Sequence, residues 1–597
     1  MAESPALPTK LPTWDLSHLY AGPQDPALSA DLDAAERRSQ GFAAKYTGKL
    51  ADLDGAGFAA AMAEYEAFME ILHKAMSYGQ LLFSVSTGDG EVGRFYQTLQ
   101  ERVTDISALT LFFTLEINRL DDDILEAKLQ NEEAGRYRPW LRELRMYRDH
   151  MLSDDIEKLL LEKSVTGRSA WVRLFEETFA DMRFDVEGVG EGLTQSEVLN
   201  LLSDKDEAKR KAASAGFGKV LGENVRLLAL VTNTLAKDKD IEDRWRNYER
   251  PVSERNLSNQ VEDEVVDALV SSVKDNYQNL AHRYFNLKAK WFGKDKLDYW
   301  DRNAPLPDDL SSKFQWDEAK SMVLDAYHAF EPTMKDVANR FFAENWIDAE
   351  PREGKDSGAF SHPVVPSAHP YILMNFHGKA RDVMTLAHEL GHGVHQVLAA
   401  DQGALMSDTP LTTAETASVF GEMLTFRKMV DSENDAARRR ILLAGKVEDM
   451  LNTVVRQVSF HEFERHVHDE RKQGELSVER LGEIWMKVQT ESLGPSIRLD
   501  DTYKNYWAYI PHFVHTPFYV YAYAFGDCLV NSLYDVFADG HEGFQQKYLE
   551  MLRAGGTKRH KELLAPFGLD AGDPKFWSRG LKVVSGFIDE LEALDQA

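Results

Sequence analysis

The chain has 597 residues, enough for about four domains of ordinary size and for a large hydrophobic core. Hydrophobic residues make up 43% of the chain and charged residues 28%, a balance that excludes fibrous and wholly disordered proteins. The formal net charge of -29 implies an acidic surface, which repels phosphate groups. We therefore expect no nucleic acid and no membrane among the partners.

Cysteine usage and the N-terminal residues indicate the cellular compartment. Cys528 is the only cysteine, which excludes an intramolecular disulfide and a cysteine-based metal site. The first residues, MAESPALPTK, lack the basic start and apolar core of a secretory signal. No uninterrupted apolar stretch approaches the roughly 20 residues that a membrane-spanning helix needs. We therefore expect a cytoplasmic protein.

Helical periodicity covers most of the sequence. Between Asp54 and Ser84, apolar side chains recur every three or four positions, at Phe58, Met62, Tyr65, Met69, Leu72 and Met76. Similar amphipathic stretches follow at 91–126, 137–163, 204–245, 260–292, 314–343, 434–472 and 476–492. The fold class is therefore predicted to be mainly α. A break at 183–203 suggests a domain boundary, with one domain at 1–200 and a second at 201–597.

The segment 381–399, RDVMTLAHELGHGVHQVLA, contains the pattern HExxH at His388, Glu389 and His392. Its apolar residues have helical spacing, so we expect a helix with both histidines on one face, one turn apart. Two imidazoles at that spacing can bind one zinc ion. Glu389 is rotated about 100° from His388 on such a helix. There it can take a proton from zinc-bound water and promote hydrolysis of an amide.

A catalytic zinc ion usually has three protein ligands. The arrangement HExxHxxGxxH is excluded, because the chain has His395 and Leu398 where that pattern needs glycine and histidine. Downstream, LTTAETASVFGEMLTF at 411–426 has helical spacing and carries Glu415 and Glu422 on one face. We predict that this segment is one helix and that Glu415 is the third ligand. Glu422 is predicted to orient a ligand imidazole through its free N–H group.

These segments resemble the oligoendopeptidase F and thimet oligopeptidase family of zinc peptidases. The likeness rests on GAFSHPVVPSAHPYILMNF, TLAHELGHGVH and TTAETASVFGEM, and it continues through RQVSFHEFE, PHFVHTPFYVYAYAFG and LRAGGTKRHKELLAPFGLD. It implies a mainly helical, two-lobed ellipsoid with a deep substrate channel, a small β element beside the active-site helix and one zinc ion per chain. It also implies an oligopeptidase-type N-terminal domain at 1–200 and a catalytic zinc peptidase domain at 201–597.

Carried over position by position, the family's zinc ligands fall on His388, His392 and Glu415, and its catalytic glutamate falls on Glu389. The family also uses a histidine and tyrosines from a C-terminal segment to stabilise the oxyanion of the reaction. In this chain the candidates for that role are His512, His515, Tyr519, Tyr521 and Tyr523. Among them we choose His512 and Tyr519 as catalytic residues.

The segment 349–380 is rich in glycine and proline and is expected to be mostly loop. Within it, 371–376 (YILMNF) has strand character. In zinc peptidases of the HExxH type an edge strand lies beside the cleft, where its backbone can pair with an extended peptide. We expect 371–376 to be that edge strand or a structural hairpin. The loop 362–370, which contains His362 and His369, has more proline than the resemblance leads us to expect, so the family's substrate specificity is not carried over to this chain, whereas its metal ligands are.

The leading hypothesis is a zinc endopeptidase that hydrolyses internal bonds of short, unstructured oligopeptides by Glu389-assisted attack of zinc-bound water. Two alternatives stay open, an HExxH zinc carboxypeptidase and a non-catalytic protein that binds peptides. A carboxypeptidase needs a basic group for the terminal carboxylate of its substrate, and no arginine cluster adjoins the motif. A protein that only binds peptides does not need a general base such as Glu389. The sequence favours no particular oligomeric state.

Overall fold

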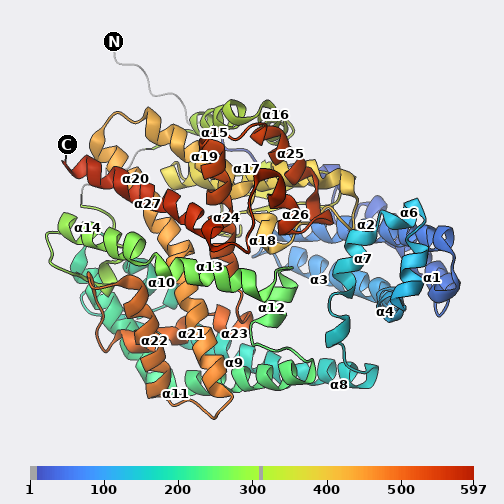
Figure 1. Ribbon diagram of the computed structural model, residues 1–597, viewed down its shortest axis with the longest axis horizontal. Helices are drawn as coiled ribbons and strands as arrows, with labels where there is room; N and C mark the ends of the chain where they lie inside the picture. The colour runs from blue at the N-terminus through green and yellow to red at the C-terminus, as the bar shows by residue number, and fades with distance from the viewer. Residues whose placement is uncertain (1–9, 308–312, 597) are drawn as a thin grey trace. The chain divides into compact units, whose positions relative to one another are not determined.

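A computed structural model describes residues 10–307 and 313–596 of the protein (Figure 1). Residues 1–9, on which the expectation of no secretory signal rests, lie outside the described part. The chain divides into two compact units, each made of three segments. The first unit comprises Met1–Arg148, Ser311–Ser432 and Gly540–Gly568, and the second comprises Asp149–Leu310, Glu433–Asp539 and Leu569–Ala597.

The N-terminal part of the first unit is helical (Figure 1, blue). Its helices are α1 (Pro26–Tyr46), α2 (Gly55–Ser84), α3 (Gly90–Ala108), α4 (Leu111–Arg119), α5 (Asp122–Lys128), α6 (Glu132–Gly135) and α7 (Arg138–Arg145). The apolar stripe predicted between Asp54 and Ser84 becomes the buried face of α2, and Asp54 caps that helix by accepting the N–H of Gly57 at 2.7 Å. Phe68 of α2 packs against Phe42 of α1, with ring centroids 5.3 Å apart.

The rest of the first unit surrounds one buried helix, α17 (Ala380–Ala399). The other helices of this part are α15 (Trp316–Phe330), α16 (Pro332–Ala343), α18 (Leu411–Ala414), α19 (Ser418–Ser432), α25 (Phe544–Arg553) and α26 (His560–Leu564). Helices α15, α16, α19 and α25 all contact α17. This packing holds α17 on several sides and leaves the histidine-bearing face for the site.

A three-stranded sheet with the order β4-β6-β5 lies beside α17. The central strand β6 (Tyr371–Leu373) pairs in parallel with β4 (Ile347–Asp348) and antiparallel with β5 (Phe360–His362). The strand predicted at 371–376 therefore exists, but the expectation that it is an edge strand is wrong, because its backbone is paired on both sides and its residues are buried. The edge strand that packs against α17 is β5, which was expected to be loop.

The second unit is also mainly helical. Its helices are α8 (Asp154–Ser164), α9 (Arg168–Asp181), α10 (Gln195–Leu201), α11 (Glu207–Trp245), α12 (Ser253–Ser258), α13 (Asp263–Asp275), α14 (Arg283–Trp291), α20 (Ala436–Thr453), α21 (Val455–Arg471), α22 (Val478–Leu493), α23 (His512–His515), α24 (Tyr521–Ala538) and α27 (Pro574–Gln596). Two small sheets join β1 (Phe184–Val186) to β2 (Gly190–Leu193) and β3 (Leu297–Asp298) to β7 (Ile497–Arg498). Within residues 10–307 and 313–596, no helix is long and apolar enough to cross a membrane.

The mainly α fold class is confirmed, although several predicted stretches are broken into shorter helices. The stretch 314–343 divides into α15 and α16 because Pro332 cannot continue a helix, and Glu331 caps the new one. The stretch 434–472 divides at Val454 into α20 and α21. The boundary predicted at residue 200 falls inside α10 and within the second unit. The division into domains at 1–200 and 201–597 stays a prediction.

Glycine allows α17 to approach its neighbours closely. A Cβ atom at Gly391 would lie 2.3 Å from the carbonyl oxygen of Ala417 and 2.6 Å from the Cα atom of Ser418. A Cβ atom at Gly393 would lie 2.4 Å from the ring of Phe341. No side chain fits at either distance, so these glycines set the spacing between α17, α19 and α16.

We expect Gly391→Ala to reduce the free energy of unfolding by about 1–3 kcal/mol, because the added methyl group forces α19 away from α17. Gly41→Ala is the matched control, since Gly41 lies on exposed α1 with no atom near its Cβ position. That change should leave stability equal or raise it by up to about 1 kcal/mol. Urea unfolding of both variants measures the difference, and equal stability of Gly391→Ala and the wild type would contradict the close packing.

Candidate active site

Helix α17 presents one apolar face to the core and one polar face to the site. Val383, Leu386, Leu390 and Val394 are fully buried and hold the helix in place. Asp382 fixes the beginning of the helix, because its carboxylate accepts the N–H groups of His377 at 2.7 Å and Lys379 at 2.9 Å. His388 and His392 therefore project from the opposite face, as the periodicity predicts.

Glu415 lies in a turn between α18 and α19, so the prediction of one continuous helix over 411–426 is wrong. The helix is interrupted where one local and one distant side chain bond to carbonyl groups that a continuous helix would use. The hydroxyl of Thr416 donates to the carbonyl oxygen of Thr413 at 2.7 Å, and that of Tyr548 donates to the carbonyl oxygen of Thr416 at 2.8 Å. The turn directs the Glu415 side chain towards α17.

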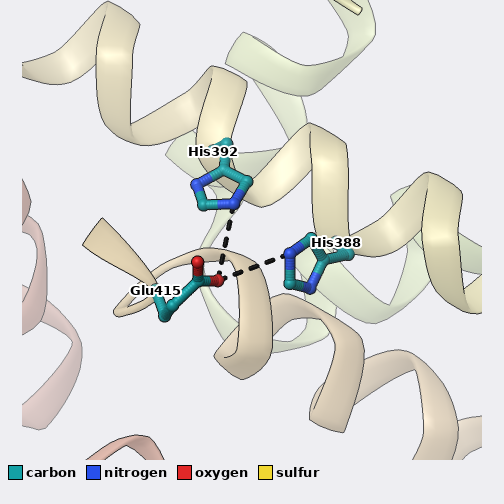
Figure 2. A group of neighbouring side chains, drawn as sticks. All are labelled: His388, His392 and Glu415. Carbon is teal, nitrogen blue, oxygen red and sulfur yellow. Dashed lines mark ion pairs between the residues drawn. The ribbon is translucent and has the colours of Figure 1, made fainter. Parts of the chain in front are cut away.

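Two imidazoles and one carboxylate meet at this point, as Figure 2 shows. The Oε2 atom of Glu415 lies 3.4 Å from Nε2 of His388 and 3.5 Å from Nε2 of His392. The hydroxyl of Ser418 donates to the same carboxylate oxygen at 2.6 Å and so fixes its position. Side chains predicted from two separate segments of the sequence are thus brought together.

The spacing of these three groups suits one metal ion. Their ligand atoms all lie within 4.8 Å of one another. Two atoms bound tetrahedrally to one zinc ion, each at about 2.0–2.1 Å, are roughly 3.3–3.4 Å apart, close to the two distances from Glu415. Two nitrogen donors and one oxygen donor are also a set that zinc commonly binds. The residues therefore fit a zinc ion that has three protein ligands.

Glu389 follows His388 on α17 and is only 6% exposed. Burial raises the pKa of its carboxyl to about 7, against the opposite effects of His388 and of a hydrogen bond from the backbone of Ser361 on β5. A carboxyl group whose pKa lies near neutrality is suited both to accept a proton and to return it. The sheet thus contributes directly to the orientation of Glu389.

Glu422 of α19 reaches the other nitrogen of His388. Its Oε2 atom lies 3.3 Å from Nδ1 of His388, while Nε2 of the same ring faces Glu415. Burial opposes charge on this imidazole, but Glu422 and the carboxylates of Glu415 and Glu389 outweigh it and raise the pKa of His388 to about 9. Burial, together with the charge of His388, lowers the pKa of His392 to about 4.

A cavity of about 800 Å³ in the first unit contains the site. His388, Glu389, His392 and Glu415 line one part of it. Strand β5 and the loop 363–370 line another part, with Phe360, Ser361, Pro363, Val364, Val365, Pro366, Ala368, His369 and Pro370. His73 of α2, Arg340 of α16 and the segment 407–409 also line the cavity. The cavity is large enough for several residues of a peptide, because typical ligand pockets measure about 300–1,000 Å³.

Comparison with known proteins identifies the family. The description of peptidase family M3 matches residues 200–583, more than half of the chain, and that of oligopeptidase F matches residues 116–184. The chain belongs to peptidase family M3. It is therefore a metallopeptidase, a hydrolase of peptide bonds, and the resemblance stated from the sequence is confirmed.

Relatives of this M3 peptidase match it over nearly its whole length. Oligopeptidase PepF of Bacillus subtilis is 27% identical over 593 residues, which cover 98% of this chain and 87% of that protein. An oligoendopeptidase F homolog of Borreliella burgdorferi is 27% identical, with 98% of each chain covered. A crystal structure of a protein from Chlamydophila abortus has the same fold, with a TM-score of 0.86, 22% identity and 98% of both chains covered. Oligoendopeptidase-F from Enterococcus faecium has a TM-score of 0.69 at 22% identity, covering 96% of this chain and 98% of that one.

The C-terminal candidates of the M3 peptidase lie in the second unit, and three of them form one cluster. The rings of His512 and Tyr519 are stacked with centroids 6.0 Å apart, and Nε2 of His512 lies 3.4 Å from the hydroxyl of Tyr523. Tyr521 is fully buried and accepts a hydrogen bond from Asn259 at 2.8 Å, as a core residue does. His515 faces Glu176 at 3.6 Å. The structure thus brings His512, Tyr519 and Tyr523 together and separates Tyr521 from them.

Other parts of the site gave no signal in the sequence. The side chain of Gln396, two turns after Glu389 on α17, donates to the carbonyl oxygen of Ser361 at 3.2 Å and accepts from the Ser361 hydroxyl at 2.9 Å. This pair joins the edge strand to the active-site helix. Ser361 lies in the stretch GAFSHPVVPSAHPYILMNF, but no pattern in the sequence pairs it with Gln396, and only the tertiary structure places them together.

We expect Glu422→Gln to weaken zinc binding about 10–100-fold, because the amide no longer holds Nδ1 of His388 as a carboxylate does. Glu353→Gln is the matched control, because Glu353 is an exposed glutamate of the same unit that lies outside the site. Competition with a chelator of known affinity measures the dissociation constant of each variant. Unchanged zinc affinity in Glu422→Gln would show that Glu422 does not orient the ligand.

Proposed function

We propose that this M3 peptidase is a zinc-dependent endopeptidase that hydrolyses internal bonds of short, unstructured oligopeptides. The observation that carries the proposal is the convergence of His388, His392 and Glu415 beside the buried carboxyl of Glu389, on the wall of a cavity wide enough for a peptide. The names of the relatives, oligopeptidase and oligoendopeptidase F, support oligopeptides as the substrate class.

In this proposal His388, His392 and Glu415 hold one zinc ion per chain. A bound zinc ion supplies Lewis acidity, which polarises a carbonyl group and makes water acidic enough to react near neutral pH. Ser418 keeps the Glu415 carboxylate in place by its hydrogen bond at 2.6 Å. Glu422 orients the ring of His388 through Nδ1, so that Nε2 points to the site.

Glu389 acts as general base and then as general acid. Its carboxylate takes one proton from the attacking water as the new carbon–oxygen bond forms. The same proton passes to the nitrogen of the scissile bond, so that the amine leaves and Glu389 is again ionised. The N–H group of Ser361 orients the carboxylate, and burial excludes bulk water that would compete for the proton.

His512 and Tyr519 are the residues that we propose to stabilise the oxyanion. Phe518 has a left-handed backbone with φ of 59°, and its N–H donates to the buried carboxylate of Glu464 at 2.8 Å. A residue other than glycine rarely adopts this conformation, so the turn before Tyr519 is held by its surroundings. One donor aimed at an oxyanion lowers the barrier by about 2.7–4 kcal/mol. Tyr523, in the same cluster, is a third candidate.

We propose that the peptide lies along strand β5, an edge strand of the sheet whose Phe360 and Ser361 line the cavity. The backbone of Ser361 is already bonded to Glu389 and Gln396, so Ser361 takes no part in backbone pairing with the peptide. We also propose that the enzyme works in the cytoplasm, because its single cysteine, Cys528, is fully buried and free and contributes no disulfide.

The decisive experiment is digestion of a peptide whose N-terminus is acetylated and whose C-terminus is amidated. We expect cleavage at an internal bond, loss of cleavage with phenanthroline, and recovery when zinc is added back. Mass spectrometry of a time course identifies the products. Failure to cut blocked peptides, with removal of C-terminal residues from unblocked ones, would instead establish a carboxypeptidase.

We expect Glu389→Gln to bind zinc and peptide while kcat falls by about 10²–10⁴-fold, because the amide cannot accept the proton of water. Zinc content, peptide affinity and turnover are measured on the same preparation, with Glu353→Gln as the control. Turnover of Glu389→Gln close to that of the wild type would exclude Glu389 as the base. Loss of zinc from this variant would assign it a ligand role instead.

A further inference from the structure

One carboxylate on the cavity wall has no part in the proposed mechanism. Asp408 lines the same cavity as the zinc-ligand candidates and precedes α18, on the segment that leads to Glu415. Its side chain is exposed to the cavity. One of its oxygens, Oδ1, accepts the N–H of Thr409 at 3.0 Å. Because the side chain is exposed on the cavity wall, a ligand can reach the carboxylate.

The backbone that carries Asp408 is rigidly held. The N–H of Gly556 donates to the carbonyl oxygen of Met406 at 2.9 Å. A Cβ atom at Gly556 would lie 2.3 Å from the carbonyl oxygen of Asp408, so only glycine permits this approach. Gly403 (φ 86°) begins the loop, and its carbonyl accepts the N–H of Ser407 at 2.9 Å. Asp408 is therefore positioned before any ligand arrives, which reduces the entropic cost of binding.

The charged groups described around Asp408 leave its carboxylate without an ion pair. In the part of the chain that the structure describes, no lysine or arginine lies within ion-pair distance of its carboxylate. His73 of α2 lines the same cavity and interacts electrostatically with Asp408, and Arg340 of α16 lines another part of the cavity. Partial desolvation in the cavity lowers the pKa of His73 and raises the pKa of Asp408, so the imidazole carries little positive charge to neutralise the carboxylate. A carboxylate on the cavity wall without a cationic partner gains from a cation that enters the cavity.

We propose that Asp408, with His73 beside it, forms a subsite for a lysine or arginine side chain of the peptide substrate. This inference rests on the proposed function, since it requires that a peptide occupy the cavity. The substrate cation supplies the ion-pair partner that the protein lacks, and the neutral imidazole of His73 can accept a further hydrogen bond from it. The subsite would favour basic peptides at one fixed position relative to the scissile bond.

The test uses pairs of blocked peptides that differ only in lysine or norleucine at one position on either side of the scissile bond. Norleucine keeps the aliphatic stem of lysine and removes the charge. The measured quantity is the ratio of kcat/KM for the lysine peptide to that for the norleucine peptide. We expect a ratio of about ten at one position in the wild type, which corresponds to roughly 1.4 kcal/mol of selective binding.

Asp408→Asn should reduce that ratio to near one, because the amide keeps the hydrogen bond to Thr409 but has no charge. Asp408→Glu should keep the ratio above that of Asp408→Asn. Asp401→Asn is the matched control, since Asp401 is an exposed aspartate on the nearby turn 400–402 that does not line the cavity. It should leave the ratio unchanged, which excludes a general effect of net charge.

Each other outcome has a definite meaning. Cleavage with a ratio near one at every position, or a ratio that survives Asp408→Asn, overturns the subsite while leaving the endopeptidase function intact. A preference of the wild type for free over acetylated N-termini, lost in Asp408→Asn, would assign the carboxylate to the terminal ammonium and overturn the side-chain assignment. Absence of cleavage of every peptide would overturn the proposed function and this inference together.

Discussion

The site depends on the close approach of two backbones, that of α17 at Gly391 and that of the turn before α19 at Ala417. A Cβ atom at Gly391 would lie 2.3 Å from the Ala417 carbonyl oxygen, so glycine is required there. Glu415 lies two residues before Ala417, and only at this separation can one carboxylate oxygen reach Nε2 of both His388 and His392. A small shift of the backbone would separate the three groups and abolish a common metal position. Packing therefore determines the chemistry directly.

Two buried tyrosines, Tyr327 and Tyr548, hold the elements around this contact with hydrogen bonds to backbone carbonyl groups. The hydroxyl of Tyr327 on α15 donates to the carbonyl oxygen of Ala387 at 2.6 Å and touches α19 at Gly421, where a Cβ atom would lie 2.2 Å from it. The hydroxyl of Tyr548 on α25 donates to the carbonyl oxygen of Thr416. The Tyr548 hydrogen bond satisfies a carbonyl group of the turn that carries Glu415. The Tyr327 hydrogen bond ties α15 to the active-site helix α17, and neither bond adds a charge near the metal position.

The sequence predicts the residue types of the site better than their local structure. The spacing of His388 and His392 determines that both imidazoles share one helical face, since four residues make about one turn. Glu415 could be chosen because a two-histidine site needs a third ligand. Helical spacing alone could not reveal the turn at Glu415, because that turn arises from hydroxyl–carbonyl bonds and from a tyrosine 132 residues away. The edge strand β5 was missed for a related reason, since its partner residues and Gln396 are brought to it only by folding.

Two of the close glycine contacts in the first unit each fix one carboxylate on the cavity wall. Gly391 fixes Glu415, and Gly556 fixes Asp408. The two carboxylates differ in the side chains around them. Glu415 forms a candidate metal-binding set with two imidazoles and accepts a serine hydroxyl, whereas Asp408 interacts electrostatically with a single imidazole, that of His73, whose pKa is lowered. The arrangement around Glu415 suits a metal ion that the protein holds. In our proposal Asp408 pairs with a positive charge on the substrate. That charge leaves the cavity with the product, which helps product release.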